Sequence, residues 1–123
     1  MAFPKNKILT CYVVDDEQHA VDATSDYILR TEGLQLNGAS TNPLQAITEV
    51  AKPGGPDLTF LDVDMPKMSG ISFAELAKPY TTIIFTTADP RQLRYAFPDE
   101  SFECLAKPFS YEKFLACIKK IRK

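Results

Sequence analysis

Residues 60–66 read Phe-Leu-Asp-Val-Asp-Met-Pro, and the rest of the chain is organised around this stretch. The run from Leu58 to Leu61 is mostly apolar, which is typical of a buried strand. Asp62 stands where that strand should end, and Pro66 cannot donate to further strand pairing because it lacks an N–H group. Since open α/β sheets bind ligands at the carboxyl ends of their strands, we expect Asp62 to face a binding crevice.

Length, composition and charge restrict the class of protein. A chain of 123 residues with 45% hydrophobic and 24% charged residues suits one globular domain with a single core. Its net charge of −2 argues against direct nucleic acid contact. The sequence has neither the apolar segment of a signal peptide nor a run long enough to span a membrane. Its three widely spaced cysteines are expected to be reduced thiols. We therefore expect a cytoplasmic protein without membrane contact.

Short β-rich runs alternate with segments of helical pattern along the whole chain. The expected strands are residues 8–14, 34–39, 58–61, 82–86 and 102–106. The expected helices are residues 18–31, 43–52 and 70–78, a helix from Asp89-Pro90 that Pro98 interrupts, and a last one that follows Ser110. In the first helix, the buried side is expected to be formed by Ala20, Ala23 and Tyr27, with Leu29 or the stem of Arg30 as a further candidate. Short connections between alternating strands and helices predict a parallel sheet with right-handed crossovers, in a three-layer α/β sandwich.

Polar side chains follow four of the predicted strands, in the order Asp15-Asp16, Asp62, Thr87 and Lys107. Because the carboxyl ends of parallel strands lie along one edge of a sheet, these residues can converge. Asp15 and Asp16 are equally consistent with acids that stabilise a helix N-terminus. However, three neighbouring carboxylates repel one another unless a cation joins them. Oxygen ligands with room for water suit Mg²⁺, so the acids predict a magnesium site.

The other three positions have simpler explanations as well. Asp62 could cap the following loop, a Thr at a strand end commonly has no function, and Lys107 could extend its charged end into solvent. As a group they suit covalent phosphoryl transfer, in which a carboxylate attacks phosphorus while nearby cations neutralise the charge. In that arrangement Asp62 is the acceptor, the Thr87 hydroxyl donates to a phosphoryl oxygen, and Lys107 balances the charge of the acids.

In this order and on this pattern of elements, the chain resembles the receiver domain of two-component response regulators over essentially its whole length. The matching segments are Val13-Val14-Asp15-Asp16-Glu17, Leu61-Asp62-Val63-Asp64-Met65-Pro66 with Ser69-Gly70, Thr86-Thr87-Ala88 and Lys107-Pro108-Phe109. The resemblance implies a flavodoxin-like (βα)5 fold with the strand order 2-1-3-4-5. It also implies one receiver domain over residues 1–123, with its ordered core at about 8–122, that acts as a signalling switch and not as an enzyme.

The resemblance further implies a role for each acid of the site. Asp62 would accept a phosphoryl group from a sensor histidine kinase. Asp16, Asp62 and the backbone carbonyl of Asp64 would bind Mg²⁺, and Asp15 would act on the metal through water.

Receivers display their phosphorylated state on the surface formed by the fourth helix, the fifth strand and the fifth helix. By resemblance, Thr87 and Lys107 would contact the phosphoryl group and switch this surface, which could also form a homodimer. Residues 95–97 and 102–109 further resemble receivers that precede LytTR-type DNA-binding domains. No such output domain follows in the chain, so we expect either a stand-alone receiver or, slightly favoured, a longer protein cut at this point.

Two positions depart from the family pattern. Three residues before Lys107, receivers usually have an aromatic residue that moves inward on phosphorylation, and this chain has Cys104. The usual readout is therefore not expected, and Phe102 is the nearest ring in the sequence. Asp64 adds an acid two residues after the expected acceptor, where it is either solvated or tunes metal affinity or dephosphorylation.

Two rival interpretations remain open. The first is a receiver-like interaction module that takes no phosphate, against which the intact Asp62, Thr87 and Lys107 argue. The second is a phosphatase similar to haloacid dehalogenases, because Asp62-Val63-Asp64 resembles their Asp-x-Asp motif. Pro66 and the lack of a cap domain argue against the phosphatase.

Overall fold

Strands and helices alternate along the chain from the first strand onward, as the sequence pattern predicts. The computed structural model describes residues 3–98 and 102–122. In chain order, the elements are β1 (Leu9–Val14), α1 (Gln18–Leu29), β2 (Leu34–Ser40), α2 (Pro43–Val50), β3 (Leu58–Asp62), α3 (Gly70–Ala77), β4 (Thr82–Thr87), α4 (Arg91–Ala96), β5 (Glu103–Ala106) and α5 (Tyr111–Ile121). Each predicted strand and helix is present, with small differences at the ends.

The strands form one parallel, five-stranded sheet in the order β2-β1-β3-β4-β5. This is the order of the flavodoxin-like fold, so the predicted topology is confirmed. β3 lies in the centre of the sheet, paired with β1 on one side and β4 on the other. All of its residues are buried, which accounts for its apolar sequence, because a strand covered on both faces has no side toward solvent.

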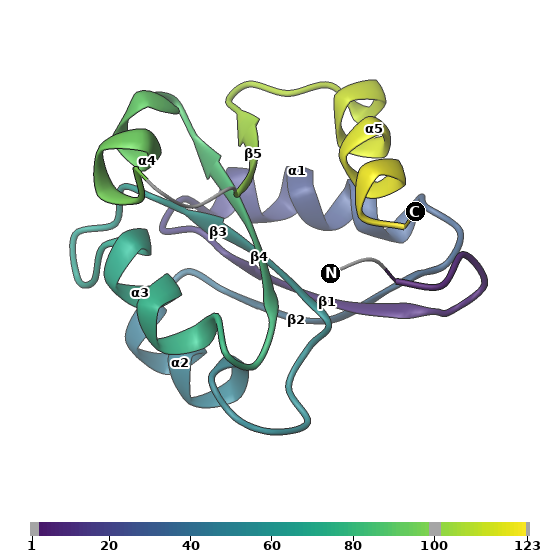
Figure 1. The fold of residues 1–123 in the computed structure, drawn as a ribbon, viewed down its shortest axis with the longest axis horizontal. Helices are drawn as coiled ribbons and strands as arrows, with labels where there is room; N and C mark the ends of the chain where they lie inside the picture. Colours follow the sequence, from purple (N-terminus) through teal and green to yellow (C-terminus); the bar gives the residue numbers. More distant parts are fainter. Residues whose placement is uncertain (1–2, 99–101, 123) are drawn as a thin grey trace.

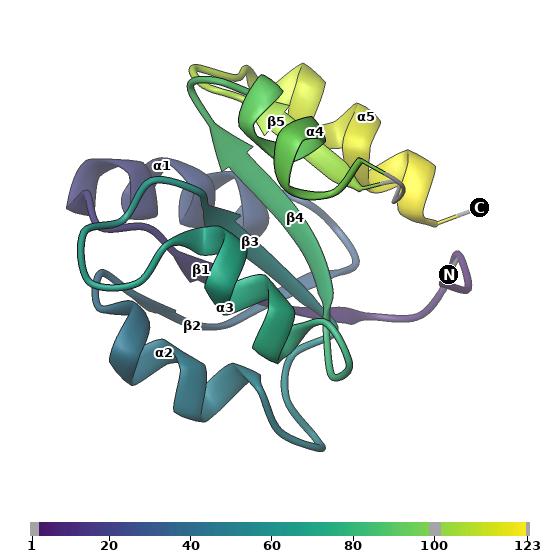
Figure 2. The same cartoon turned by 60° about the vertical axis from the view of Figure 1, so that its left-hand side comes forward.

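Helices cover both faces of the sheet (Figures 1 and 2). Two hydrophobic cores are formed by residues of the helices and of the strands. One core contains Val21 and Ile28 of α1 together with Phe114 of α5. The other core contains Phe73 of α3 and Leu93 of α4, together with buried residues of α2. The predicted three-layer α/β sandwich is therefore confirmed. No helix within the described ranges has the length and apolar character needed to cross a membrane.

The buried side of α1 differs from the predicted one. The residues of this helix that are buried are Val21, Thr24 and Ile28. Of the predicted set, Ala20 and Tyr27 are half-buried. The others are exposed, namely Ala23, Leu29 and Arg30. The prediction was wrong by about one position. The polar residue Thr24 occupies a core position, so the buried side of the helix does not show a regular apolar periodicity in the sequence.

The start of α3 packs directly against the end of β3. The Gly70 N–H donates to the Val63 carbonyl over 2.8 Å. A Cβ at Gly70 would lie 2.8 Å from the Val63 Cα and closer still to the carbonyl oxygen of Asp62. The Ser69 hydroxyl caps the helix by accepting from the Ser72 N–H over 3.2 Å. The Ser69-Gly70 pair therefore fixes the loop that leaves Asp62.

Candidate functional site

The carboxyl ends of four strands bring the predicted site residues to one edge of the sheet. Asp15 follows β1, Asp62 ends β3, Thr87 ends β4, and Lys107 follows β5. Asp15, Asp62 and Thr87 are buried, whereas Asp16 is exposed. The order of the strands in the sheet thus places residues from distant parts of the sequence around one crevice.

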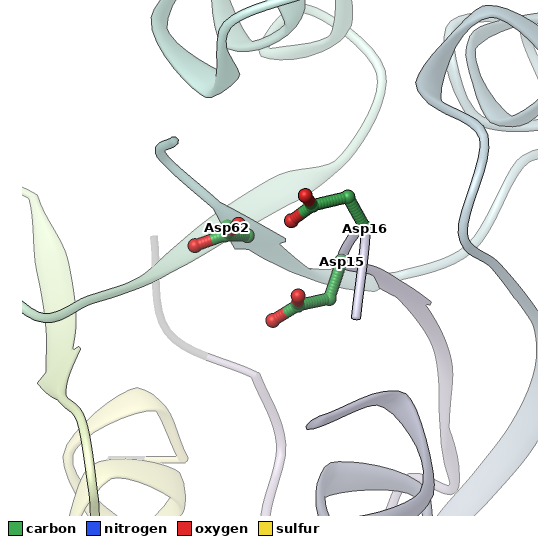
Figure 3. Close-up of side chains that lie close together, drawn as sticks. All are labelled: Asp15, Asp16 and Asp62. Atoms are coloured by element: carbon green, nitrogen blue, oxygen red, sulfur yellow. The ribbon is translucent and has the colours of Figure 1, made fainter. Parts of the chain in front are cut away.

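Three carboxylates point toward a common space at the ends of β1 and β3 (Figure 3). One oxygen from each of Asp15, Asp16 and Asp62 lies within 4.8 Å of the others. This donor set fits Mg²⁺, which prefers carboxylate oxygens and keeps several waters in its coordination shell. The exposure of Asp16 leaves the solvent side of the cluster open to those waters.

Lys107 is the counter-charge of the two buried acids. Its Nζ donates to Asp15 Oδ2 over 2.7 Å and to Asp62 Oδ1 over 3.2 Å. Burial opposes the charged ammonium group, but the hydrogen bonds and charges of Asp15 and Asp62 prevail and raise the pKa of Lys107 above its usual value. Lys107 therefore stays protonated across the physiological pH range and holds the two carboxylates on one cation.

Asp62 is a strongly perturbed acid. Burial, and next the negative charge of Asp15, raise its pKa to about 7, although Lys107 partly opposes this change. A hydrogen bond with Asp16 adds to the increase. A carboxylate that is costly to ionise in the metal-free protein favours the arrival of a cation, because the cation stabilises the charged form.

Thr87 connects the end of β4 to two neighbouring segments. It is fully buried, and it lies one residue beyond Thr86, the partner of Asp62 in the sheet register. Its Oγ1 accepts from the Asp89 N–H over 3.0 Å, just before α4 begins. Its carbonyl accepts from the Lys107 N–H over 2.8 Å. A displacement of Thr87 would therefore act on both the start of α4 and the end of β5.

The additional acid of the motif, Asp64, lies apart from the carboxylate cluster. Its side chain is exposed, and it lines a groove between the β3–α3 loop and α4 together with Ser69 and Tyr95. Of the four acids named from the sequence, three thus contribute carboxylate oxygens to the cluster. The predicted contribution of Asp64 is its backbone carbonyl, which stays a prediction.

Cys104 occupies the central part of β5, opposite Phe85 in the sheet register. Its thiol is half-buried, and this burial raises its pKa, with Arg94 nearby opposing the increase. The Phe85 ring also contacts two other rings, with centroid distances of 6.0 Å to Phe97 and 6.2 Å to Phe102. Aromatic side chains are therefore present around Cys104 on the α4 side of the sheet, although that position itself carries none.

A further contact to the site was not found from the sequence. The hydroxyl of Tyr27, in α1, donates to the carbonyl of Phe109 over 3.1 Å. Phe109 belongs to the loop between Lys107 and α5. The two residues lie far apart in the chain, and no local pattern links them, so only the folded structure reveals their contact.

Comparison with known proteins agrees with this geometry. The family model described as the response regulator receiver domain matches residues 11–119. An uncharacterised response regulatory protein of Shewanella oneidensis is 30% identical over 118 residues, which cover 94% of this chain and 50% of that protein. The sensory transduction protein LytT of Bacillus anthracis is 29% identical over 119 residues, covering 94% of this chain and 48% of LytT.

A similar fold is found in the chemotaxis protein CheY4 of Vibrio cholerae. Its structure superposes with a TM-score of 0.77 at 21% sequence identity, covering 93% of this chain and 98% of that one. The chain itself spans about half the length of the curated relatives named above. Because the receiver model matches nearly all of the sequence, the chain belongs to the response regulator receiver domain family of two-component signalling proteins.

Proposed function

We propose that this receiver takes a phosphoryl group from a sensor histidine kinase onto Asp62, in a reaction that depends on Mg²⁺. The observation that carries the proposal is the ammonium group of Lys107, which bridges Asp15 and Asp62 beside a third carboxylate. Phosphoryl transfer depends mainly on positioning and on charge neutralisation. This crevice combines an acceptor carboxylate, a fixed cation and an oxygen-rich donor set for a metal.

In the proposed step, an oxygen of the Asp62 carboxylate attacks the phosphorus of a phosphohistidine. A P–O bond forms, the P–N bond breaks, and its electron pair returns to the imidazole of the kinase. Asp16, Asp62 and the backbone carbonyl of Asp64 would hold Mg²⁺, with Asp15 acting through water, and the metal would supply positive charge to the phosphoryl oxygens. Lys107 would move from a carboxylate partner to a phosphoryl oxygen.

Thr87 would act on the phosphoryl group and on the rest of the molecule together. Its hydroxyl would donate to a phosphoryl oxygen, and its contacts with Asp89 and Lys107 would carry the displacement outward. We propose that the surface made by α4, β5 and α5 changes in response and controls a dimer contact or an output domain. The length of the relatives and the similarity to LytT support an output domain of the LytTR type in a longer protein.

Small phosphodonors test this proposal without the kinase. Incubation with acetyl phosphate and Mg²⁺ should add the mass of one phosphoryl group, and peptide mapping should place it on Asp62. Asp62→Asn should abolish the adduct, and removing Mg²⁺ with EDTA should prevent it in the parent. Stoichiometric labelling of the Asn variant would rule out Asp62 as the acceptor. An unlabelled parent would favour the interaction module.

A further inference from the structure

The segment that carries Lys107 is attached to α1 by an aromatic cluster. The ring centroid of Tyr27, in α1, lies 5.4 Å from that of Tyr111 and 5.6 Å from that of Phe114, both in α5. It also lies 5.9 Å from that of Phe109, in the β5–α5 loop. The packing of these rings does not involve the hydroxyl of Tyr27, so this group can make a hydrogen bond of its own.

That hydroxyl donates to the Phe109 carbonyl over 3.1 Å. On the other side of the loop, the Lys107 N–H donates to the Thr87 carbonyl over 2.8 Å. The backbone of Lys107 is therefore held by a bond to β4 at its own N–H and by a bond to α1 two residues later. Beyond the loop, the Ser110 hydroxyl caps α5 by accepting from the Lys113 N–H over 3.1 Å.

We propose that Tyr27 is a positioning residue for phosphoryl transfer, acting through Lys107. The inference rests on the proposed function of Asp62 and names a residue outside the crevice that the reaction needs. The hydroxyl of Tyr27 fixes the β5–α5 loop so that the Lys107 ammonium group stays where it reaches Asp15, Asp62 and the incoming phosphoryl oxygens.

The physical reason is the length of the lysine side chain. Its long flexible stem can place the charge correctly only if the backbone of Lys107 is fixed. Any motion of that backbone spreads the ammonium group over more positions. Small displacements of a charged group that meets the transition state lower the rate substantially. Removing the Tyr27 hydroxyl releases one of the two bonds beside Lys107 and leaves the packing of the rings in place.

The chain offers a matched control in Tyr111. Its hydroxyl likewise joins α5 to α1, donating to the Arg30 carbonyl over 3.1 Å and lying 3.0 Å from the Thr31 hydroxyl. Tyr111→Phe therefore removes a hydroxyl from the same helix–helix contact but leaves the loop bond to Phe109 intact. Both Phe variants keep their rings, so both are expected to fold, and thermal unfolding midpoints would verify this.

The experiment measures the rate of phosphorylation by acetyl phosphate, with Mg²⁺, in the parent and in four variants: Tyr27→Phe, Tyr111→Phe, Lys107→Ala and the double variant Tyr27→Phe/Lys107→Ala. Tyr27→Phe should lower the rate constant by about three- to tenfold. Tyr111→Phe should stay within about twofold of the parent, as expected for a residue that does not position the loop. In the Lys107→Ala background, Tyr27→Phe should have no further effect on the rate constant. The effects of two substitutions are not additive when one residue acts through the other.

Several results would overturn the inference while leaving the proposed function in place. These are an unchanged rate in Tyr27→Phe, an equal loss in Tyr111→Phe, or a full additional loss in the Lys107→Ala background. A Lys107→Ala variant that reacts as fast as the parent would overturn the inference and also the role proposed for Lys107 in phosphoryl transfer. A parent protein that takes no phosphate on Asp62 would instead remove the proposed function, and the inference with it. If the parent does take phosphate on Asp62, faster amide hydrogen exchange at residues 109–111 in Tyr27→Phe than in the parent would show directly that the loop has been released.

Discussion

Asp15 and Asp62 share the ammonium group of Lys107, and one cation cannot fully balance two buried carboxylates and the nearby Asp16. The metal-free crevice therefore carries more negative charge than its surroundings favour. Burial is the main cause of the raised pKa of Asp62, and this negative charge adds to it. A site of this kind costs folding free energy when empty and gains it back when a cation or a phosphoryl group with its metal is bound.

At this scale the first prediction concerns pH. Asp62 has a pKa of about 7 in the folded protein against an ordinary value of 3.8, so between these values the folded state binds more protons than the unfolded state. The free energy of unfolding of the metal-free protein should fall as the pH rises through this window and level off above it. The shift corresponds to at most about 4 kcal/mol, and we expect about 1–3 kcal/mol because water that enters the crevice relaxes the site.

Denaturant unfolding in EDTA measures this effect, with Asp62→Asn as the variant that no longer titrates. Relative to the parent, the variant should gain stability on going from pH 4.5 to pH 8. A stability difference between the two proteins that is the same at both pH values would show that Asp62 does not carry the pH dependence.

A second prediction concerns the metal. Asp16→Asn should weaken Mg²⁺ binding by about tenfold or more, because it removes a charged oxygen ligand from the cluster. The fold of the metal-free variant should remain intact, since Asp16 is exposed. Asp64→Asn is the control, because the side chain of Asp64 lies outside the cluster and the variant keeps the backbone carbonyl at this position. Calorimetric titration should find near-parental affinity in Asp64→Asn, and parental affinity in Asp16→Asn would refute the proposed ligand set.

At the scale of elements, Gly70 determines how α3 meets β3. Gly70→Ala should lower the free energy of unfolding by about 1–3 kcal/mol, because the new Cβ would collide with the backbone of Asp62 and Val63. Gly54→Ala is the comparison: that glycine has a positive φ of 82° but no atom within 4 Å of the added Cβ. It should cost about 1 kcal/mol through backbone strain alone.

Denaturant unfolding of both variants provides the measurement, and Mg²⁺ binding provides a second one. Only Gly70→Ala should also weaken the metal site, because it displaces the loop that leaves Asp62. A Gly70→Ala variant as stable as the parent would contradict this prediction, because it would mean that α3 can move away from β3 without a cost in free energy.

The elements also show which features a sequence reveals. The caps at Asn42 and Ser110 were predictable because each involves a side chain and a backbone N–H only a few residues apart. The convergence of Asp15, Asp62 and Lys107 was predictable as well, because parallel strands end at one edge of the sheet. The buried side of α1 was not, since Thr24 occupies a core position through its tertiary neighbours.

At the scale of the whole molecule, the crevice and the outer surface are linked through β4 and β5. Thr87 holds the start of α4 through Asp89 and the end of β5 through Lys107. The Phe85 ring, two residues before Thr87, contacts Phe97 just after α4 and Phe102 just before β5. These contacts offer a route from the proposed phosphoryl site to the α4–β5–α5 surface that does not need an aromatic residue at position 104.

We therefore expect phosphorylation to reach that surface despite Cys104. A phosphoryl group adds negative charge and strong acceptor oxygens, so it should draw Thr87 and Lys107 toward Asp62 and strain the bond between the Thr87 hydroxyl and the Asp89 N–H. Backbone amide spectra recorded on adding beryllofluoride and Mg²⁺ should change at residues 88–97 and 102–104 as well as around the crevice. Thr87→Val, which keeps the shape of the side chain and loses the hydroxyl, should reduce the changes at 88–97, and Asp62→Asn should show none. Changes confined to the neighbours of Asp15 and Asp62 would mean that the coupling is lost and that the domain only stores phosphate.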